Sequence, residues 1–265
     1  MAPADEILST ITAVFFMLAL MQFSFRYLKS SWDIYFFLIT FCLFRVVAYG
    51  IRAYMNSGAI TPTDKSFMNL YIAELILLSI GAVFIMKLLA RLYGTILPRL
   101  RTPTLNEADL FERCLVENTK YFLLPLIVLV IAGAIYSTPG HSVSEQRLGL
   151  VLRKIGICLL MILGIWFLHA AFIYRSRYPA NRYAFTVALV ATLLFDITLV
   201  YKLVSTFYAD AQTQTVVYFI FQVLMELMGL CVLSVDLQVH FLGKSFSAEK
   251  EEDIEAAQHG TTHGR

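Results

Sequence analysis

The sequence predicts an all-α membrane protein, a seven transmembrane helix bundle with its N-terminus outside and its C-terminus in the cytosol. Three observations predict it. Of the 265 residues, 58% are hydrophobic and only 15% are charged, whereas a soluble domain carries about 25% charged residues. The apolar residues gather in runs of about 20, the length that spans a hydrocarbon layer. Lys and Arg are divided unevenly between the two sets of loops.

Seven apolar segments make up the predicted transmembrane domain, residues 1–243. The first follows an acidic N-terminus without a basic region, which is unlike a cleaved signal peptide. The fourth is the shortest, and Pro125 lies near its start, where a proline is tolerated. The predicted helices cover residues 7–27, 33–55, 70–93, 121–136, 151–174, 183–208 and 215–242. Residues 244–265 are polar and poor in aromatic residues, which predicts a disordered cytosolic tail.

The distribution of basic residues predicts the orientation. The loops after the first, third and fifth helices and the tail hold thirteen: Arg26, Lys29, Arg91, Arg99, Arg101, Arg113, Lys120, Arg175, Arg177, Arg182, Lys244, Lys250 and Arg265. The N-terminus and the other loops hold four: Lys65, Arg147, Arg153 and Lys154. The basic side faces the cytosol, so the longest loop, 94–120, is expected there. We expect that loop to be solvated, with a short helix along the headgroups; the alternative is a docking surface for a cytosolic partner.

Six ionisable residues lie inside the predicted spans at two depths. Near the midplane are Arg45, Asp196 and Glu226, and in the outer layer are Arg52, Glu74 and Lys202. A charge at the centre of a transmembrane helix costs about 3 kcal/mol on insertion scales, so such residues face the bundle interior and pair. We therefore expect Arg45 to pair with Glu226 or Asp196, and Arg52 to pair with Glu74.

Helical spacing predicts which faces carry this polar network. Tyr49 lies between Arg45 and Arg52 on one stripe of the second predicted helix. Gln222 precedes Glu226 by four residues and shares its face on the seventh. We expect these faces to meet between the second, third, sixth and seventh helices.

Two interpretations of the network remain open. The ion pairs could fix only the packing of the helices, as in a membrane scaffold, since a buried pair often contributes little net stability. Alternatively, the network could line a polar pocket that opens outward and binds an amphiphile headgroup or relays a conformational change, as in a transporter or a receptor. We favour the pocket, because six ionisable residues exceed what one packing register needs.

Several functions are disfavoured by missing motifs. Residues 215–242 contain no Lys, so no retinal Schiff base can form there. No set of three facing His or carboxylate ligands, nucleotide-binding loop or nucleophile elbow is present. The basic residues form no surface stripe of the kind that binds nucleic acid. We expect no enzyme activity, no cofactor, no metal and no nucleic-acid partner.

Three stretches carry a family resemblance: AYGIRAYM (48–55), IMKLLARLYGTIL (85–97) and LVYKLVSTFYA (199–209) followed by Glu226. They resemble segments of the fungal lipid-translocating exporter family, which is linked to aminocholesterol resistance; the layout is also similar to related uncharacterised fungal seven-helix proteins. The resemblance implies a role in lipid asymmetry or in resistance to amphiphilic toxins. It also implies membrane lipids or amphiphilic small molecules as partners, with Arg52 and Glu226 as functional residues. We expect residence in the plasma membrane, with an internal membrane as the alternative.

Overall fold

The computed structural model of the protein describes residues 3–30, 33–61, 64–96, 107–138, 142–177, 182–207 and 215–234. Within these ranges every regular element is helical. The elements are α1 (Pro3–Ser30), α2 (Asp33–Asn56), α3 (Lys65–Ile96), α4 (Glu107–Tyr136), α5 (Val143–Arg177), α6 (Arg182–Phe207), α7 (Thr215–Tyr218), the π-helix η4 (Phe219–Leu224) and α8 (Met225–Leu233). The last three follow one another without a break, so together they form one rod, which we call the last helix.

The described helices are long and apolar enough for a multi-pass membrane protein. Six of them meet the length and composition of a membrane span, and the apolar part of α4, Tyr121–Tyr136, is shorter. Large apolar side chains are exposed along the outside of the bundle, for example those of Phe25, Leu28, Leu124, Ile162 and Phe172. Such a surface would promote aggregation in water, but lipid chains cover it in a bilayer.

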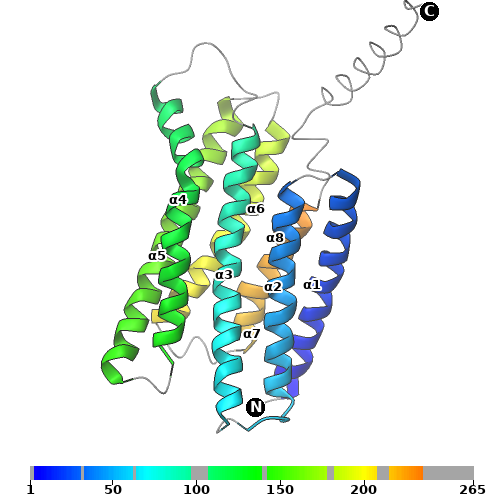
Figure 1. Ribbon diagram of the computed structural model, residues 1–265. Coiled ribbons are helices and arrows are strands. Elements are labelled where there is room, and N and C mark those ends of the chain that lie inside the picture. Colours follow the sequence, from blue (N-terminus) through cyan, green and yellow to red (C-terminus); the bar gives the residue numbers. More distant parts are fainter. Residues whose placement is uncertain are drawn as a thin grey trace, which may run out of the picture.

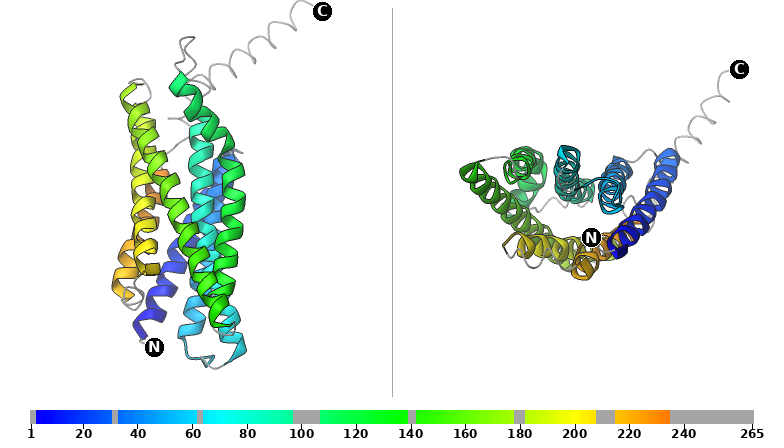
Figure 2. Two further views of the ribbon diagram at one scale, coloured as in Figure 1. Left: turned by 90° about the vertical axis from the view of Figure 1, so that its left-hand side faces the viewer. Right: turned by 90° about the horizontal axis from the view of Figure 1, so that it is seen from below.

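The helices form a closed ring. From α1 to α6 each helix packs against its neighbours in the chain, α6 packs against α8, and α8 contacts α1. Seen along the bundle, α2, α3 and α4 lie on one side, and α6 with the last helix lies on the other (Figure 2). Across the ring, α3 also contacts α5 and α6. Residues of α3 therefore reach both sides of the bundle.

One end of the bundle, which we call the N-side end, holds the start of α1, the end of α2 and the start of α3 (Figure 1). The end of α4, the start of α5 and the start of α7 lie at the same end. The helix ends at 30, 96 and 177 lie at the opposite end. This alternation is what a chain that crosses a membrane repeatedly requires.

Four predicted helices are clearly longer in the structure: those predicted as 7–27 and 70–93 extend at both ends, to Pro3–Ser30 and Lys65–Ile96, and the fourth and fifth begin earlier than predicted. The segment predicted as 121–136 begins at Glu107, so Pro125 lies inside α4 rather than in its first turn. Residues 107–120 were predicted as part of the 94–120 loop; they include many good helix formers and continue α4 beyond its apolar part. Residues 97–106 of that loop lie outside the described residues.

The helix predicted as 151–174 begins at Val143, eight residues earlier. Ser142 and Glu145 form a reciprocal capping box: the Ser142 amide donates to Glu145 Oε2 at 2.8 Å, and the Glu145 amide donates to Ser142 Oγ at 3.3 Å. Close packing against α4 also holds this first part of α5. A Cβ on Gly149 would lie 2.4 Å from the Ser137 backbone nitrogen, so only glycine fits this contact. The end of the predicted last helix, 235–242, and the predicted tail, 244–265, lie outside the described residues.

Candidate ligand site inside the bundle

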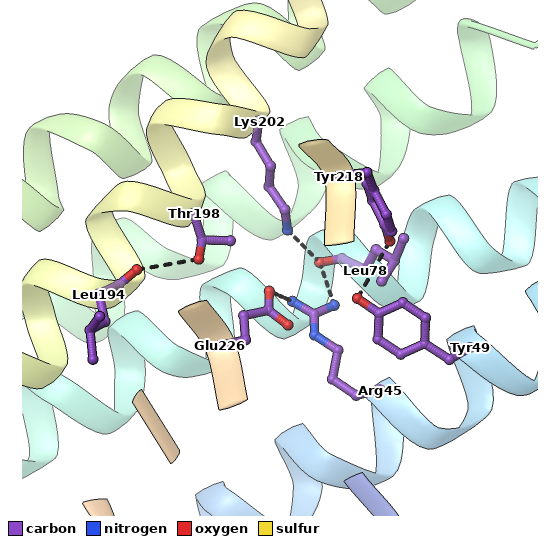
Figure 3. Close-up of polar contacts among 8 residues, drawn as sticks. All are labelled: Arg45, Tyr49, Leu78, Leu194, Thr198, Lys202, Tyr218 and Glu226. Atoms are coloured by element: carbon purple, nitrogen blue, oxygen red, sulfur yellow. Dashed lines mark hydrogen bonds and ion pairs between the residues drawn. The ribbon is translucent and has the colours of Figure 1, made fainter. Parts of the chain in front are cut away.

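Arg45 lies in the interior of the bundle and is completely buried. Its Nη2 forms an ion pair with Oε1 of Glu226 on α8, and its Nη1 donates to the Leu78 carbonyl oxygen on α3 at 3.0 Å (Figure 3). The guanidinium also lies over the Phe41 ring, 4.8 Å from its centroid. Of the two partners that the sequence left open for Arg45, the structure places Glu226 beside it.

Gly81 makes room for this guanidinium. A Cβ at position 81 would lie 3.0 Å from both Cζ and Nη1 of Arg45. In a helix, a side chain covers the turn that precedes it, so the residue three positions after Leu78 normally shields the Leu78 carbonyl. Because residue 81 is glycine, that carbonyl remains accessible to side chains from other helices.

Lys202 of α6 donates to the same carbonyl. Its Nζ lies 3.0 Å from the Leu78 oxygen, on the opposite side from Arg45 (Figure 3). One backbone oxygen of α3 therefore joins side chains of α2 and α6, while Glu226 adds α8 through the ion pair. Arg45 was predicted in the midplane layer and Lys202 in the outer layer, so this carbonyl connects the two layers.

A second ion pair lies closer to the N-side end. Arg52 Nη1 is 3.4 Å from Glu74 Oε1, which agrees with the pairing expected from their depths. The Arg52 guanidinium also lies 4.1 Å from the centroid of the Tyr218 ring, and Tyr218 donates to the Tyr49 hydroxyl at 3.4 Å. Tyr49 is completely buried and thereby links the stripe of α2 to the last helix.

Asp196 is separate from this network. Its side chain packs against Gly164 of α5, where a Cβ would lie 2.0 Å from Oδ1. Neither of its carboxylate oxygens has a hydrogen-bond partner among the described residues. The prediction that Asp196 belongs to one network with Arg45 is not met, because depth along a helix does not determine which face a residue occupies.

The π-helix η4 positions three polar residues of the last helix. Tyr218, Gln222 and Glu226 are spaced four apart and are all buried. A π-turn holds more residues than an α-turn, so positions four apart stay closer to one line than in a regular α-helix. As a result Tyr218 reaches Arg52 while Glu226 reaches Arg45. Gln222 lies between them, and its Nε2 has no partner among the described residues.

A cavity of about 340 Å³ lies next to these residues, towards the N-side end. Five charged side chains contribute to its wall: Asp5, Arg52, Glu74, Arg153 and Lys202. Leu78, Tyr201, Tyr218 and Gln222 also line it. The cavity is bordered by helices from α1 to the last helix, including α4 and α5, and so extends further than the predicted interior of four helices.

The predicted site residues divide into three groups. Arg52, Glu74, Lys202 and Gln222 line the cavity. Arg45, Tyr49 and Glu226 form the buried layer beside it, connected through Leu78 and Tyr218. Asp196 lies apart.

Sequence reasoning missed Arg153, which was assigned to a helix end because the fifth helix was predicted to begin at 151. Residues 142–145, SVSE, carry the capping-box signal that places the helix start at Val143. With that start, Arg153 lies almost three turns into α5, at the depth of the cavity. The contribution of Tyr218 could not be read from the sequence, because no local pattern marks the π-helix.

Within the described ranges, no group of three His, Cys, Asp or Glu side chains is placed to hold a metal ion. Comparisons of the chain with protein-family models, with curated proteins and with solved structures give no match. The geometry of the cavity and its charged wall is therefore the basis for assigning a function.

Proposed function

We propose that this protein binds the polar headgroup of a membrane lipid or amphiphilic small molecule in the cavity, and that it acts in lipid translocation or in resistance to amphiphiles. The observation that carries the proposal is the cavity of about 340 Å³ with five charged side chains in its wall. This volume lies in the range of small-molecule sites, about 300–1,000 Å³.

The energetics of the bilayer support this function. Charged groups inside a membrane are costly and commonly mark a ligand or ion pathway. A core needed only for packing would have its polar groups paired and no open volume between them. Here Gln222 Nε2 has no partner among the described residues, and the cavity lies beside it. The sequence resemblance to lipid-translocating exporters points to the same class of ligand.

The orientation proposed for this function has seven membrane crossings, with α4 included and the N-side end outside. The supporting observation is the excess of Lys and Arg at the opposite end, thirteen against four as counted from the predicted helix ends. The cavity then opens towards the outer leaflet, where external amphiphiles enter the plasma membrane. A fluorescent fusion of the full chain tests the location.

The direct test is photo-crosslinking in lipid nanodiscs. The full chain is exposed to a panel of photoactivatable lipids and amphiphiles, and the crosslinked peptides are identified by mass spectrometry. We expect crosslinks to residues that line the cavity. Ser79 lies in the cavity wall, so Ser79→Phe should fill part of the volume and abolish them.

The matched control is Ser144→Phe, which makes the same substitution at an exposed position outside the cavity wall. It should leave crosslinking unchanged. If Ser79→Phe folds and every panel member crosslinks as before, the cavity is not the ligand site. That result would favour the scaffold interpretation, in which the ion pairs serve packing alone.

A further inference from the structure

We propose that the ligand of the cavity carries an anionic headgroup of the phosphate type, and that Arg153 of α5 and Lys202 of α6 hold it. This inference rests on the proposed function, that an amphiphile binds in this cavity. It adds the charge and chemistry of the headgroup and the two residues that select it.

The distribution of charge around the cavity leaves an excess of positive charge at one part of its wall. Arg45 pairs with Glu226, and Arg52 pairs with Glu74, so these four charges compensate one another. Arg153 and Lys202 form no ion pair with any described residue, although both line the cavity. Asp5, the remaining acid in the wall, interacts electrostatically with Arg52 on α2.

Unused hydrogen-bond donors surround the same volume. A Lys ammonium has three donors and an Arg guanidinium has five. Lys202 makes one hydrogen bond, to the Leu78 carbonyl, and no hydrogen bond joins the Arg153 guanidinium to a described acceptor. The Nε2 of Gln222, which is 3% exposed, is also without a partner among the described residues. Donor groups from α5, α6 and η4 therefore line one cavity with N–H hydrogens that no described acceptor uses, and the same wall holds one buried acceptor without a partner among the described residues, Asp5 Oδ1.

An anion with several acceptor oxygens fits this arrangement best. Two cations in one low-dielectric cavity repel each other, and a buried charge without a partner is costly. A phosphate group supplies a negative charge and acceptors for all three donor groups, with charge-assisted hydrogen bonds to Arg and Lys. A cationic headgroup would add to the repulsion, and an apolar group would leave the donors unpaired.

The test compares two fluorescent lipids that differ only in the phosphate: a phosphatidate analogue and the matching diacylglycerol. The full chain is placed in phosphatidylcholine nanodiscs, and binding of each lipid is measured. We expect phosphatidate to bind at least about tenfold more tightly, a difference of about 1.4 kcal/mol. Competition with inorganic phosphate separates two sources: competition means that free phosphate suffices, and its absence means that the headgroup must be on a lipid.

Substitutions then test the two residues. Arg153→Gln and Lys202→Met should each weaken phosphatidate binding by about tenfold or more. Lys154→Gln is the matched control, because Lys154 is adjacent in α5 but lies 4.4 Å from the centroid of the Phe207 ring and does not line the cavity. It should bind phosphatidate as the original chain does, and Arg153→Lys should retain part of the affinity.

A second measurement separates ligand binding from a structural role. Lys202→Met removes a half-buried cation that forms no ion pair with a described residue, so we expect the thermal unfolding midpoint of the variant to stay the same or rise. A lowered midpoint with unchanged phosphatidate binding would overturn the inference. Binding of neutral or cationic amphiphiles, but not phosphatidate, would overturn it while leaving the proposed function in place; no amphiphile binding at all would overturn both.

Discussion

The Arg45 guanidinium is accommodated in the bundle by groups from other helices. Glu226 supplies the opposite charge, Leu78 supplies a carbonyl acceptor, and Gly81 supplies the space. Each of these is a local feature with a separate physical effect. Substitutions can therefore test charge and space independently.

Removing one member of the ion pair should be far worse than removing both. Arg45→Met leaves the Glu226 carboxylate buried without a partner, and losing one partner of a buried pair costs about 3–5 kcal/mol. The double variant Arg45→Met with Glu226→Met leaves neither charge and should recover most of that loss. Thermal unfolding of the original chain, Arg45→Met, Glu226→Met and the double variant in one detergent measures the coupling between the two residues. Equal midpoints for the single and double variants would contradict the described pairing.

The space that Gly81 leaves for the Arg45 guanidinium should be required for stability. Gly81→Ala places a Cβ 3.0 Å from the Arg45 guanidinium, and we expect a loss of about 1–3 kcal/mol from this overpacking. Gly50→Ala on α2 is the matched control, since a Cβ there meets no atom within 4 Å. Its higher helix propensity should leave stability unchanged or raise it by up to about 1 kcal/mol. Thermal unfolding compares the two; an equal loss in both would mean that neighbouring atoms do not limit position 81.

At the residue scale, the sequence predicted the ion pairs better than the other contacts that surround them. Depth along the helices was enough to match Arg52 with Glu74 and to limit Arg45 to two partners. It could not choose between Glu226 and Asp196, because that choice depends on the rotation of each helix about its own axis. The hydrogen bonds of Arg45 and Lys202 to the Leu78 carbonyl could not be predicted either, since a backbone acceptor has no sequence signal.

At the scale of a helix, the last rod differs most from a regular α-helix. Its π-helical segment Phe219–Leu224 lies between the residue that reaches Arg52 and the residue that reaches Arg45. The register of the rod is therefore part of the site. The predicted single helix over 215–242 contained no indication of this change, because π-segments have no strong composition of their own.

Inserting one residue into the π-segment should separate its two contacts. The segment already holds more residues per turn than an α-helix, so an alanine inserted after Ile220 should rotate Tyr218 relative to Glu226, by about 100° for one residue. We expect a lower unfolding midpoint, and we expect Tyr218→Phe to have no further effect in that background. Ile220→Ala is the control, because it shortens an exposed side chain and keeps the register. A Tyr218→Phe effect of the same size in both backgrounds would show that the register is unimportant.

The start of α5 illustrates the value of local capping signals. Hydropathy alone predicts that this helix begins at 151. The capping box formed by Ser142 and Glu145 places its start at Val143, where the structure has it. The additional turns are polar at the N-side end, which is why an apolar window omits them. The box is visible in the sequence, and it is sufficient to place Arg153 within the bundle.

At the scale of the whole molecule, the all-helical fold and the apolar exterior followed directly from composition and run length. The closed ring did not, because hydropathy carries no information about which helices touch. The contact of α3 with α5 and α6 in particular joins segments far apart in the chain. That contact determines which charged residues share the cavity.

The proposed orientation predicts a pattern of chemical labelling. Ser57 directly follows α2 at the N-side end, Ser176 lies in the last turn of α5 at the other end, and both are exposed. In a background with Cys42, Cys114, Cys158 and Cys231 replaced, Ser57→Cys should react with a membrane-impermeant thiol reagent on intact cells. Ser176→Cys should react only after permeabilisation. The reverse pattern would invert the orientation, and equal labelling of both sites on intact cells would mean that they lie on one side.

The short apolar part of α4 has a consequence for how the chain enters the membrane during synthesis. Tyr121–Tyr136 is briefer than the other spans and is followed by α5, which packs closely against it at Gly149. Insertion of α4 should therefore depend on the synthesis of α5, so that the two enter as a hairpin. A chain in which α4 stayed out would carry α5, α6 and the last helix upside down. Arg153 and Lys202 would then lie in the opposite leaflet from Arg52 and Glu74, the charged residues of α2 and α3 with which they line the cavity.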